Sequence, residues 1–280
     1  DLVNKYIIYT KNITYQKNDE IIFTTNGSKA ISVNDSIEIS ADDFNYNLIL
    51  NTITAEKKVS VIDKANDYKI FSDFFKYFKN EEKIITKGET LADIKSKYNI
   101  ESSNITFLRN KMEMNSNEKT IITDKLNLYS LSKFKYFINE EELRGEKILI
   151  SSNYNLPKND NFYFSSGIID LKNLNFKASD TEITIHKNIF DNSENDPRIK
   201  GVSSSRNGEI TIINKGVFTS CKKSENCPPW AIQANEIKHD KKKNEIYYKN
   251  AILKVYDIPI LYLPKFFHPD PTVNRKSGIL

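Results

Sequence analysis

The chain has 280 residues, of which 39% are apolar and 28% charged, and its formal net charge at neutral pH is +4. This length predicts one or two domains with a substantial core. Lysines alternate with carboxylates instead of forming a basic run, so the charge gives no indication of nucleic-acid binding. No apolar run approaches the roughly eighteen residues of a membrane-spanning helix. The last four residues, Ser277 to Leu280, read as the start of another strand, so we expect a segment of a longer protein.

A four-residue apolar signature recurs through the first half of the chain, roughly every thirty residues, a period typical of stacked repeats. One copy is Ile39, Ala41, Phe44 and Tyr46, and the other copies begin at Ile8, Ile70, Ile100 and Tyr129. Steps of two residues place side chains on one face of a strand. The central step of three inserts an extra residue, as a bulge or corner does. The pattern predicts an all-β stack of bent strands around one interior.

The inward-facing residues of these repeats allow two interpretations. They could pack against one another as a dry core, which the pattern alone favours, or they could line an open trough that holds acyl chains. The small side chains of Ser72 and Ser102 are compatible with a trough. The candidate interior residues are Ile39, Phe44, Tyr46, Ile70, Phe75, Tyr77, Ile105, Phe107, Phe134 and Tyr136.

The second half of the chain keeps the signature more loosely. In the first half, residues 89–100 alternate with period two and predict a strand. The signature returns near Phe164, Phe176 and Ile232, whereas residues 191–206 predict a polar, turn-rich loop. An insertion or a domain edge is expected near 190–207.

The sequence contains no catalytic constellation and indicates no cofactor. His186, His239 and His268 lie far apart, without the spacing that metal sites use. Paired carboxylates such as Asp42–Asp43 and Glu141–Glu142 are expected in turns or at corners. A β-solenoid that binds or cleaves polysaccharide could hide its acids there, and this class is the alternative function.

Two cysteines, Cys221 and Cys227, are too far apart for a redox C-x-x-C motif and lack a second pair for zinc. In an oxidising compartment they would pair with each other or with cysteines outside this chain. A disulfide is the favoured interpretation, and two free thiols are the alternative.

The last sixty-five residues resemble the LptD family of lipopolysaccharide-assembly outer-membrane proteins, also called organic-solvent-tolerance (OstA) proteins. The resemblance rests on an ordered series of short motifs, which are Gly-Val-Phe-Thr-Ser-Cys at 216–221, Pro-Trp-Ala-Ile-Gln-Ala at 229–234, Ile-Pro-Ile-Leu-Tyr-Leu-Pro at 258–264, His-Pro-Asp-Pro at 268–271 and Arg-Lys-Ser-Gly-Ile-Leu at 275–280. The two-cysteine form with His-Pro-Asp-Pro is most similar to alphaproteobacterial members. The upstream repeats are similar to OstA-type units only at the level of pattern.

The resemblance implies an OstA-type β-jellyroll, open along one side, on the periplasmic side of a Gram-negative outer membrane. Its apolar interior would shield the acyl chains of lipopolysaccharide. A periplasmic bridge protein, LptA, would dock by strand continuation on the edge near residues 6–15. The lipid would pass to a transmembrane barrel that is absent from this chain and is plugged by the lipoprotein LptE. No catalysis and no nucleic acid are implied.

The resemblance also implies a division into a jellyroll over residues 1–215 and, over 216–280, the last jellyroll strands with the junction to the barrel. The family pairs a cysteine at the position of Cys221 with one in the barrel, so a local bond to Cys227 competes with that pairing. The residues expected at the junction are Trp230, Pro259, Tyr262, Pro264, Pro269, Pro271, Arg275 and Gly278.

Overall fold

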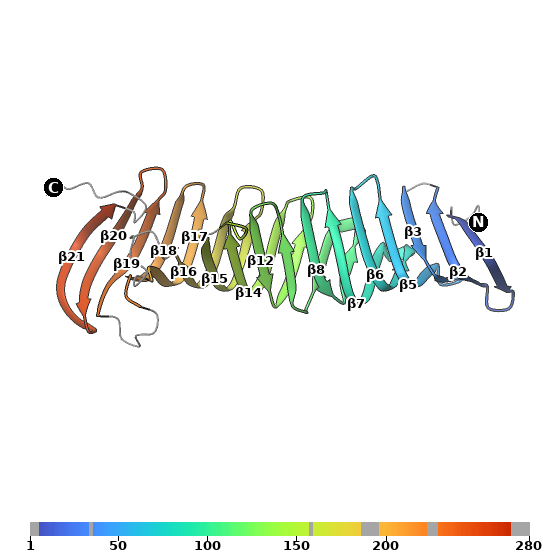
Figure 1. Ribbon diagram of the computed structural model, residues 1–280, viewed down its shortest axis with the longest axis horizontal. Coiled ribbons are helices and arrows are strands. Elements are labelled where there is room, and N and C mark those ends of the chain that lie inside the picture. The colour runs from blue at the N-terminus through green and yellow to red at the C-terminus, as the bar shows by residue number, and fades with distance from the viewer. Residues whose placement is uncertain (1–5, 34–35, 157–158, 186–195, 223–228, 270–280) are drawn as a thin grey trace. The chain divides into compact units, whose positions relative to one another are not determined.

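The computed structural model describes residues 6–33, 36–156, 159–185, 196–222 and 229–269. These residues form antiparallel strands and two short 3-10 turns (Figure 1). Within the described ranges, no helix is long and apolar enough to cross a membrane. The all-β, jellyroll-type fold expected from the repeats is confirmed.

The chain divides into two compact units, with the division in and after strand β12 (Asn127–Leu131). The strands of unit 1 are β1 (Tyr6–Gln16), β2 (Ile21–Ser32), β3 (Ile37–Ala41), β4 (Asp43–Asn47), β5 (Thr52–Asp63), β6 (Tyr68–Phe78), β7 (Lys83–Ile94), β8 (Tyr98–Ser103), β9 (Thr106–Leu108), β10 (Glu113–Ser116), β11 (Thr120–Thr123) and β13 (Lys133–Phe137), and its 3-10 turns are η1 (Lys79–Glu81) and η2 (Arg109–Lys111).

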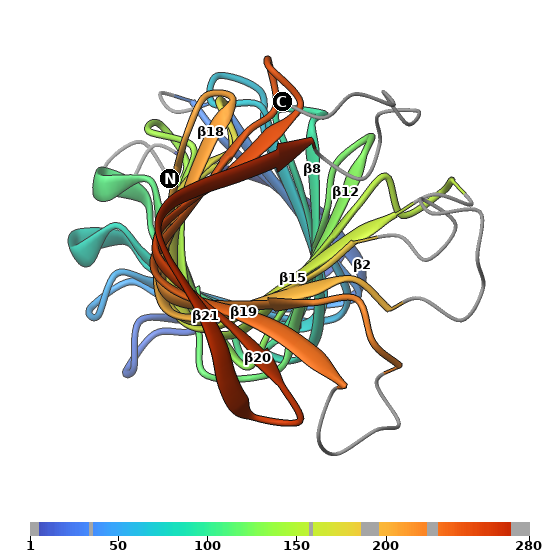
Figure 2. The ribbon, with the colours of Figure 1, turned by 90° about the vertical axis from the view of Figure 1, so that its left-hand side faces the viewer.

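Unit 2 is a succession of hairpins in which each strand pairs with the next. Seen along the stack in Figure 2, its strands curve around a common interior. Its strands are β14 (Glu142–Ser152), β15 (Asp160–Asp170), β16 (Asn175–Thr184), β17 (Arg198–Asn207), β18 (Ile210–Thr219), β19 (Trp230–Asp240), β20 (Glu245–Val255) and β21 (Ile258–Pro269).

The three-residue step of the signature is where each bent layer turns its corner. Asp42 separates β3 from β4, and Asn104 lies between β8 and β9. In β6 the register shifts between Ser72 and Phe74: on the β5 side these two residues pair with Val59 and Glu56, and the pairing with β7 shifts at the same place. At Gly88 on β7 the corner takes φ = +74°, a left-handed conformation that glycine adopts without strain. The predicted corner is therefore confirmed in its position.

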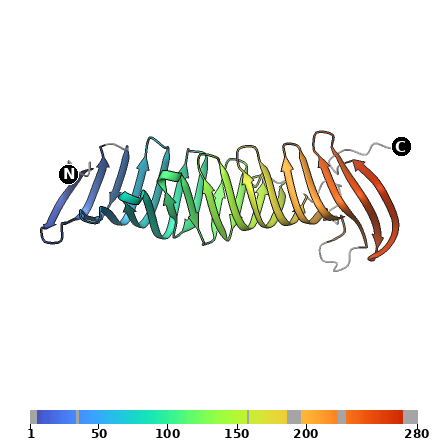
Figure 3. The same ribbon diagram turned by 180° about the vertical axis from the view of Figure 1, so that it is seen from behind.

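Burial alternates along both arms of each bent strand, so one face of the sheet points inward. In β3 and β4 the inward positions are buried and the intervening ones half-exposed. The copy of the signature in β1 is different, because Ile13 and Tyr15 are 62% and 53% exposed on this terminal strand. The stacked strands of unit 1 and of unit 2 are also seen from behind in Figure 3.

The structure changes some expected boundaries. The loop predicted over residues 191–206 is wrong for its last part, because Arg198–Asn207 is strand β17, in which serines 203–205 pair on both sides. The strand predicted over 89–100 is two strands joined by a turn at 95–97. Gly216 lies inside β18, where a Cβ on that glycine would lie 2.6 Å from Ile237 Cδ1, and the division of the chain expected at this residue stays a prediction.

Candidate functional site

The ten candidate interior residues all face inward in unit 1 and are shielded from water. Their exposed fractions range from 0% for Ile39, Phe107 and Tyr136 to 3% for Phe44. Rings from different layers meet edge to face, as in Tyr68 and Phe107, whose centroids are 5.0 Å apart. In this structure the interior of unit 1 is thus packed on itself. Whether these side chains also bind lipid stays a prediction.

A seam runs along one side of each unit, between two rows of turns. Every bent layer runs from one row to the other, so its two ends meet across the seam. In unit 1, row A contains the turns that follow β2, β5 and β7, and row B contains the turns that follow β1, β4, β6 and β9. In unit 2, we call the C-terminal ends of β14, β16 and β18 row A and the C-terminal ends of β15, β17 and β19 row B, each with the start of the strand that follows. The walls are held by backbone ladders, whereas side chains connect the two rows.

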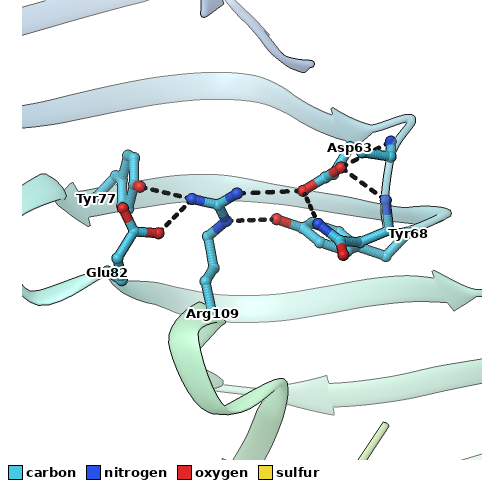
Figure 4. Close-up of polar contacts among 7 residues, drawn as sticks. Asp63, Tyr68, Tyr77, Glu82 and Arg109 are labelled. Carbon is cyan, nitrogen blue, oxygen red and sulfur yellow. Dashed lines mark hydrogen bonds and ion pairs between the residues drawn. The ribbon is translucent and has the colours of Figure 1, made fainter. Parts of the chain in front are cut away.

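Arg109, in the row B turn after β9, crosses the seam of unit 1 (Figure 4). On the row A side its Nε donates to the Tyr68 hydroxyl at 3.0 Å, and its Nη2 lies 3.3 Å from Asp63 Oδ2. On the row B side its Nη1 donates to the Tyr77 hydroxyl at 2.8 Å and to the Glu82 carboxylate. We call these five residues the Arg109 clasp.

Electrostatics favour the charged form of the clasp. Burial alone would lower the pKa of Arg109, but the nearby Tyr68, Tyr77 and Glu82 raise it above its ordinary value. Burial would raise the pKa of Asp63, and hydrogen bonds from Asn66 and Tyr68 together with the charge of Arg109 lower it instead. The Asp63 side chain is 0% exposed and that of Arg109 only 9%, so each charge relies on the other members of the clasp.

Two lysines make further contacts across the seam of unit 1. Lys79, in row B, lies 4.6 Å from the ring centroid of Tyr6 and 3.4 Å from the hydroxyl of Tyr46. Lys95, in row A, donates to the carbonyl of Ile138 at 3.3 Å, beyond the end of β13. Cationic side chains therefore link the two rows at several layers of this unit.

The seam of unit 2 contains a cavity of about 270 Å³. One side is formed by residues near the row A ends of the strands and the other by residues near their row B ends. The lining consists of Asp160, Phe162, Ile183, Ile185, Ile199, Arg206, Thr211, Ile213, His239, Lys241 and Asn244. The cavity thus has apolar walls and a polar rim.

Arg206, near the row B end of β17, lies between this cavity and a smaller one of about 20 Å³. Its guanidinium carbon is 4.8 Å and 5.0 Å from the ring centroids of Phe162 and Phe176, and its Nε donates to Thr211 Oγ1 at 3.0 Å. Burial lowers the pKa of Arg206, and the charges of Asp160 and Glu209 oppose this only in part. Among the described residues the structure records no ion pair for Arg206.

The sequence candidates at the C-terminal end of unit 2 are brought together only in part. The Trp230 ring lies 5.8 Å from that of Phe218, and the Tyr248 hydroxyl is 2.9 Å from His268 Nε2. His239 lines the cavity, and among the described residues no cluster of three side chains could hold a metal ion. Four predicted junction residues, Pro259, Tyr262, Pro264 and Pro269, lie in β21.

Several predictions fall on positions for which the structure gives no description. Cys227, His186, Pro271, Arg275 and Gly278 lie outside the described residues. Cys221 is half-buried, with its Sγ 3.6 Å from the carbonyl oxygen of Trp230. Its pairing with Cys227 or with a cysteine elsewhere stays a prediction.

The terminal strands β1 and β21 each pair with a single neighbour among the described residues. On β1, Ile7 and Tyr9 are 47% and 57% exposed, and on β21 Ile258 and Tyr262 are 64% and 56% exposed. Each strand therefore presents a free backbone edge flanked by apolar side chains, which is a template for strand addition.

Sequence reasoning missed the Arg109 clasp and Arg206. A compositional signal was available, because arginine is rare in this lysine-rich chain and occurs only at Arg109, Arg144, Arg198, Arg206 and Arg275. A planar guanidinium can hydrogen-bond in several directions at once, which suits a partly buried bridging position better than lysine does.

Comparison with known proteins relates the chain to one group of relatives. No protein-family model matches the chain. It is 25% identical over 167 residues, 56% of this chain, to the LPS-assembly protein LptD of Vibrio cholerae, and 22% identical over 191 residues, 65% of this chain, to that of Aliivibrio fischeri. Over a shorter stretch of 78 residues, 26% of this chain, it is 41% identical to the LptD of Pseudoalteromonas translucida.

The matched regions cover 21%, 24% and 10% of these curated relatives, so the chain corresponds to a minor part of their length. The resemblance indicated by the sequence motifs is nevertheless confirmed. The chain is similar to, and a relative of, the LPS-assembly proteins LptD.

Proposed function

We propose that this chain is a lipopolysaccharide-receiving module, which shields acyl chains inside its bent β-layers during transport to the outer membrane. The observation that carries the proposal is the inward row of buried aromatic and aliphatic side chains, bounded by a seam that side chains close. The names of the relatives, LPS-assembly proteins, support the same function.

The seam is the natural entry path for an acyl chain. Separating neighbouring strands within a wall would break a ladder of backbone hydrogen bonds, whereas separating the two rows of turns breaks side-chain contacts only. Each buried methylene contributes about 0.8 kcal/mol, which offsets the loss of the contacts between interior side chains. This transfer requires no covalent chemistry in the chain.

The free strand edges support specific partners. The exposed edge of β1 suits backbone pairing with a periplasmic bridge protein of the LptA type. At the other end, β21 would lead toward a transmembrane barrel with its LptE-type lipoprotein. The module would then act at the periplasmic side of the outer membrane of a Gram-negative bacterium.

Photo-crosslinking tests the function directly. A photoreactive amino acid replaces Phe75 or Phe107 in the interior, and in matched controls Leu91 or Leu149, which are 52% and 38% exposed. The full-length protein is irradiated in cells that make lipopolysaccharide. We expect lipopolysaccharide adducts from the interior positions only. Failure of both interior positions in folded protein, or equal yields from all four, would refute the proposal.

A further inference from the structure

The cavity in the seam of unit 2 combines an apolar pocket with a half-buried cation, Arg206. Five of its lining residues are apolar and buried, namely Phe162, Ile183, Ile185, Ile199 and Ile213, with exposed fractions between 0% and 9%. Arg206 stands at the same cavity with its guanidinium against two aromatic rings. Such a combination matches a ligand with a hydrocarbon chain and an anionic group.

The hydrogen bonds of Arg206 leave room for an anion. Among the described residues its guanidinium donates one, from Nε to Thr211 Oγ1, although it carries five N–H donors. The charges of Arg206 and Lys241 are balanced by those of Asp160 in the lining and Glu209 nearby. Arg109 in unit 1, by contrast, is held by two carboxylates and two phenols. An anion at Arg206 would supply the charge-assisted hydrogen bonds that Arg109 already has.

We propose that the cavity is a binding site for an anionic amphiphile, in which Arg206 holds the phosphate or carboxylate group while the chain lies between Phe162 and the isoleucines. This inference rests on the proposed function and deepens it, because it assigns a residue that recognises charge to one position along the lipid path. Arg206 would also fix the depth at which the chain enters, since Phe162 and Phe176 hold the guanidinium plane in place.

The test measures binding of three probes to the full chain by calorimetry: lauryl phosphate, lauryl maltoside and inorganic phosphate. We expect lauryl phosphate to bind more tightly than lauryl maltoside, and inorganic phosphate to bind far more weakly. In Arg206→Gln the affinity for lauryl phosphate should fall about tenfold or more, the value of one or two charge-assisted hydrogen bonds. Its affinity for lauryl maltoside should stay unchanged.

Two further variants control for folding and for general charge. Arg144→Gln removes an exposed arginine of the same unit, whose side chain is 51% exposed, and should leave all three affinities unchanged. Arg206→Lys keeps the charge and should retain part of the preference for lauryl phosphate. If Arg206→Gln fails to fold, Arg206→Lys decides: a preference for lauryl phosphate that is reduced relative to the parent supports the proposal, and an unchanged preference would overturn it.

The outcomes separate this inference from the proposed function. Equal binding of lauryl phosphate and lauryl maltoside, unaffected by Arg206→Gln, would overturn the role of Arg206 and leave chain shielding intact. Inorganic phosphate that binds as tightly as lauryl phosphate would identify a simple anion site and overturn the amphiphile proposal. If neither amphiphile binds, the inference fails, and the crosslinking at Phe75 and Phe107 decides the proposed function independently.

Discussion

Unit 1 and unit 2 share bent strands and an apolar inward face, yet their seams differ. In unit 1 a guanidinium joins the two rows of turns through two carboxylates and two phenols, and the side chains behind it are buried. In unit 2 the corresponding line contains a cavity, and the guanidinium of Arg206 rests on aromatic rings instead of carboxylates. The same kind of bent-strand layer can thus have a seam closed by side chains or a seam with a cavity, and the difference lies in a few side chains at the strand ends.

The packing difference predicts the largest effect. Phe107→Ala in unit 1 removes a ring that is 0% exposed and leaves a cavity, so it should lower the free energy of unfolding by about 3–5 kcal/mol. Hydrogen exchange of peptides from unit 1 measures the loss locally. A loss below about 1 kcal/mol would mean that unit 1 is as loosely packed as the cavity region of unit 2.

Breaking the clasp should have the next largest effect. Arg109→Met leaves the Asp63 carboxylate buried without its cation, which should cost about 3 kcal/mol. Peptides that contain the turns at 63–68 and 79–82 should exchange faster, because both rows lose their link. In the matched control, Arg144→Met should change stability by less than about 0.5 kcal/mol. Equal effects of the two substitutions would show that the clasp does not hold the seam.

Enlarging one buried isoleucine in each unit compares the two interiors directly. Ile84→Phe in unit 1 should destabilise by about 1–3 kcal/mol through overpacking. Ile199→Phe in unit 2 should be close to neutral, because that side chain borders the cavity. Hydrogen exchange in each unit during thermal unfolding distinguishes the two variants. The reverse order would mean that Ile84 has more free space beside it than Ile199, which borders the cavity.

The smallest expected effect is the loss of stability of unit 1 at acid pH, when Asp63 is protonated. The pKa of Asp63 in the folded protein is below its ordinary value of 3.8, so its contribution to stability is complete above that pH and is lost as the pH falls below it. Unit 1 should therefore lose protection in this range, and Asp63→Asn should flatten the dependence. The strands around the cavity of unit 2 serve as the comparison, and their protection from hydrogen exchange should fall less over the same pH range. If the stability of unit 1 depended on pH in the same way in the parent and in Asp63→Asn, Asp63 would not be the group responsible.

The local features of this fold can be predicted from the sequence, whereas the side-chain contacts across the seam cannot. The two-three-two spacing predicts both the corner at Asp42 and the burial of Phe44, because strand period and the extra residue act over a few positions. Asp63 and Arg109 meet although 46 positions separate them, and no local pattern encodes that meeting. The predicted loop over β17 failed for a related reason, since its serines are stabilised by backbone pairing with β16 and β18 and not by apolar periodicity.

The central proposal is that acyl chains reach the interior through the seam, which the Arg109 clasp bridges in unit 1. It is tested most directly by lipopolysaccharide crosslinking from positions 107 and 199, measured in the parent and in Arg109→Lys. Lysine keeps the charge but lacks the planar fork of five donors with which Arg109 bonds four side chains in the two rows. The account predicts a higher yield at Phe107 in the variant and an unchanged yield at Ile199. An unchanged yield at Phe107, or an equal rise at both positions, would contradict it.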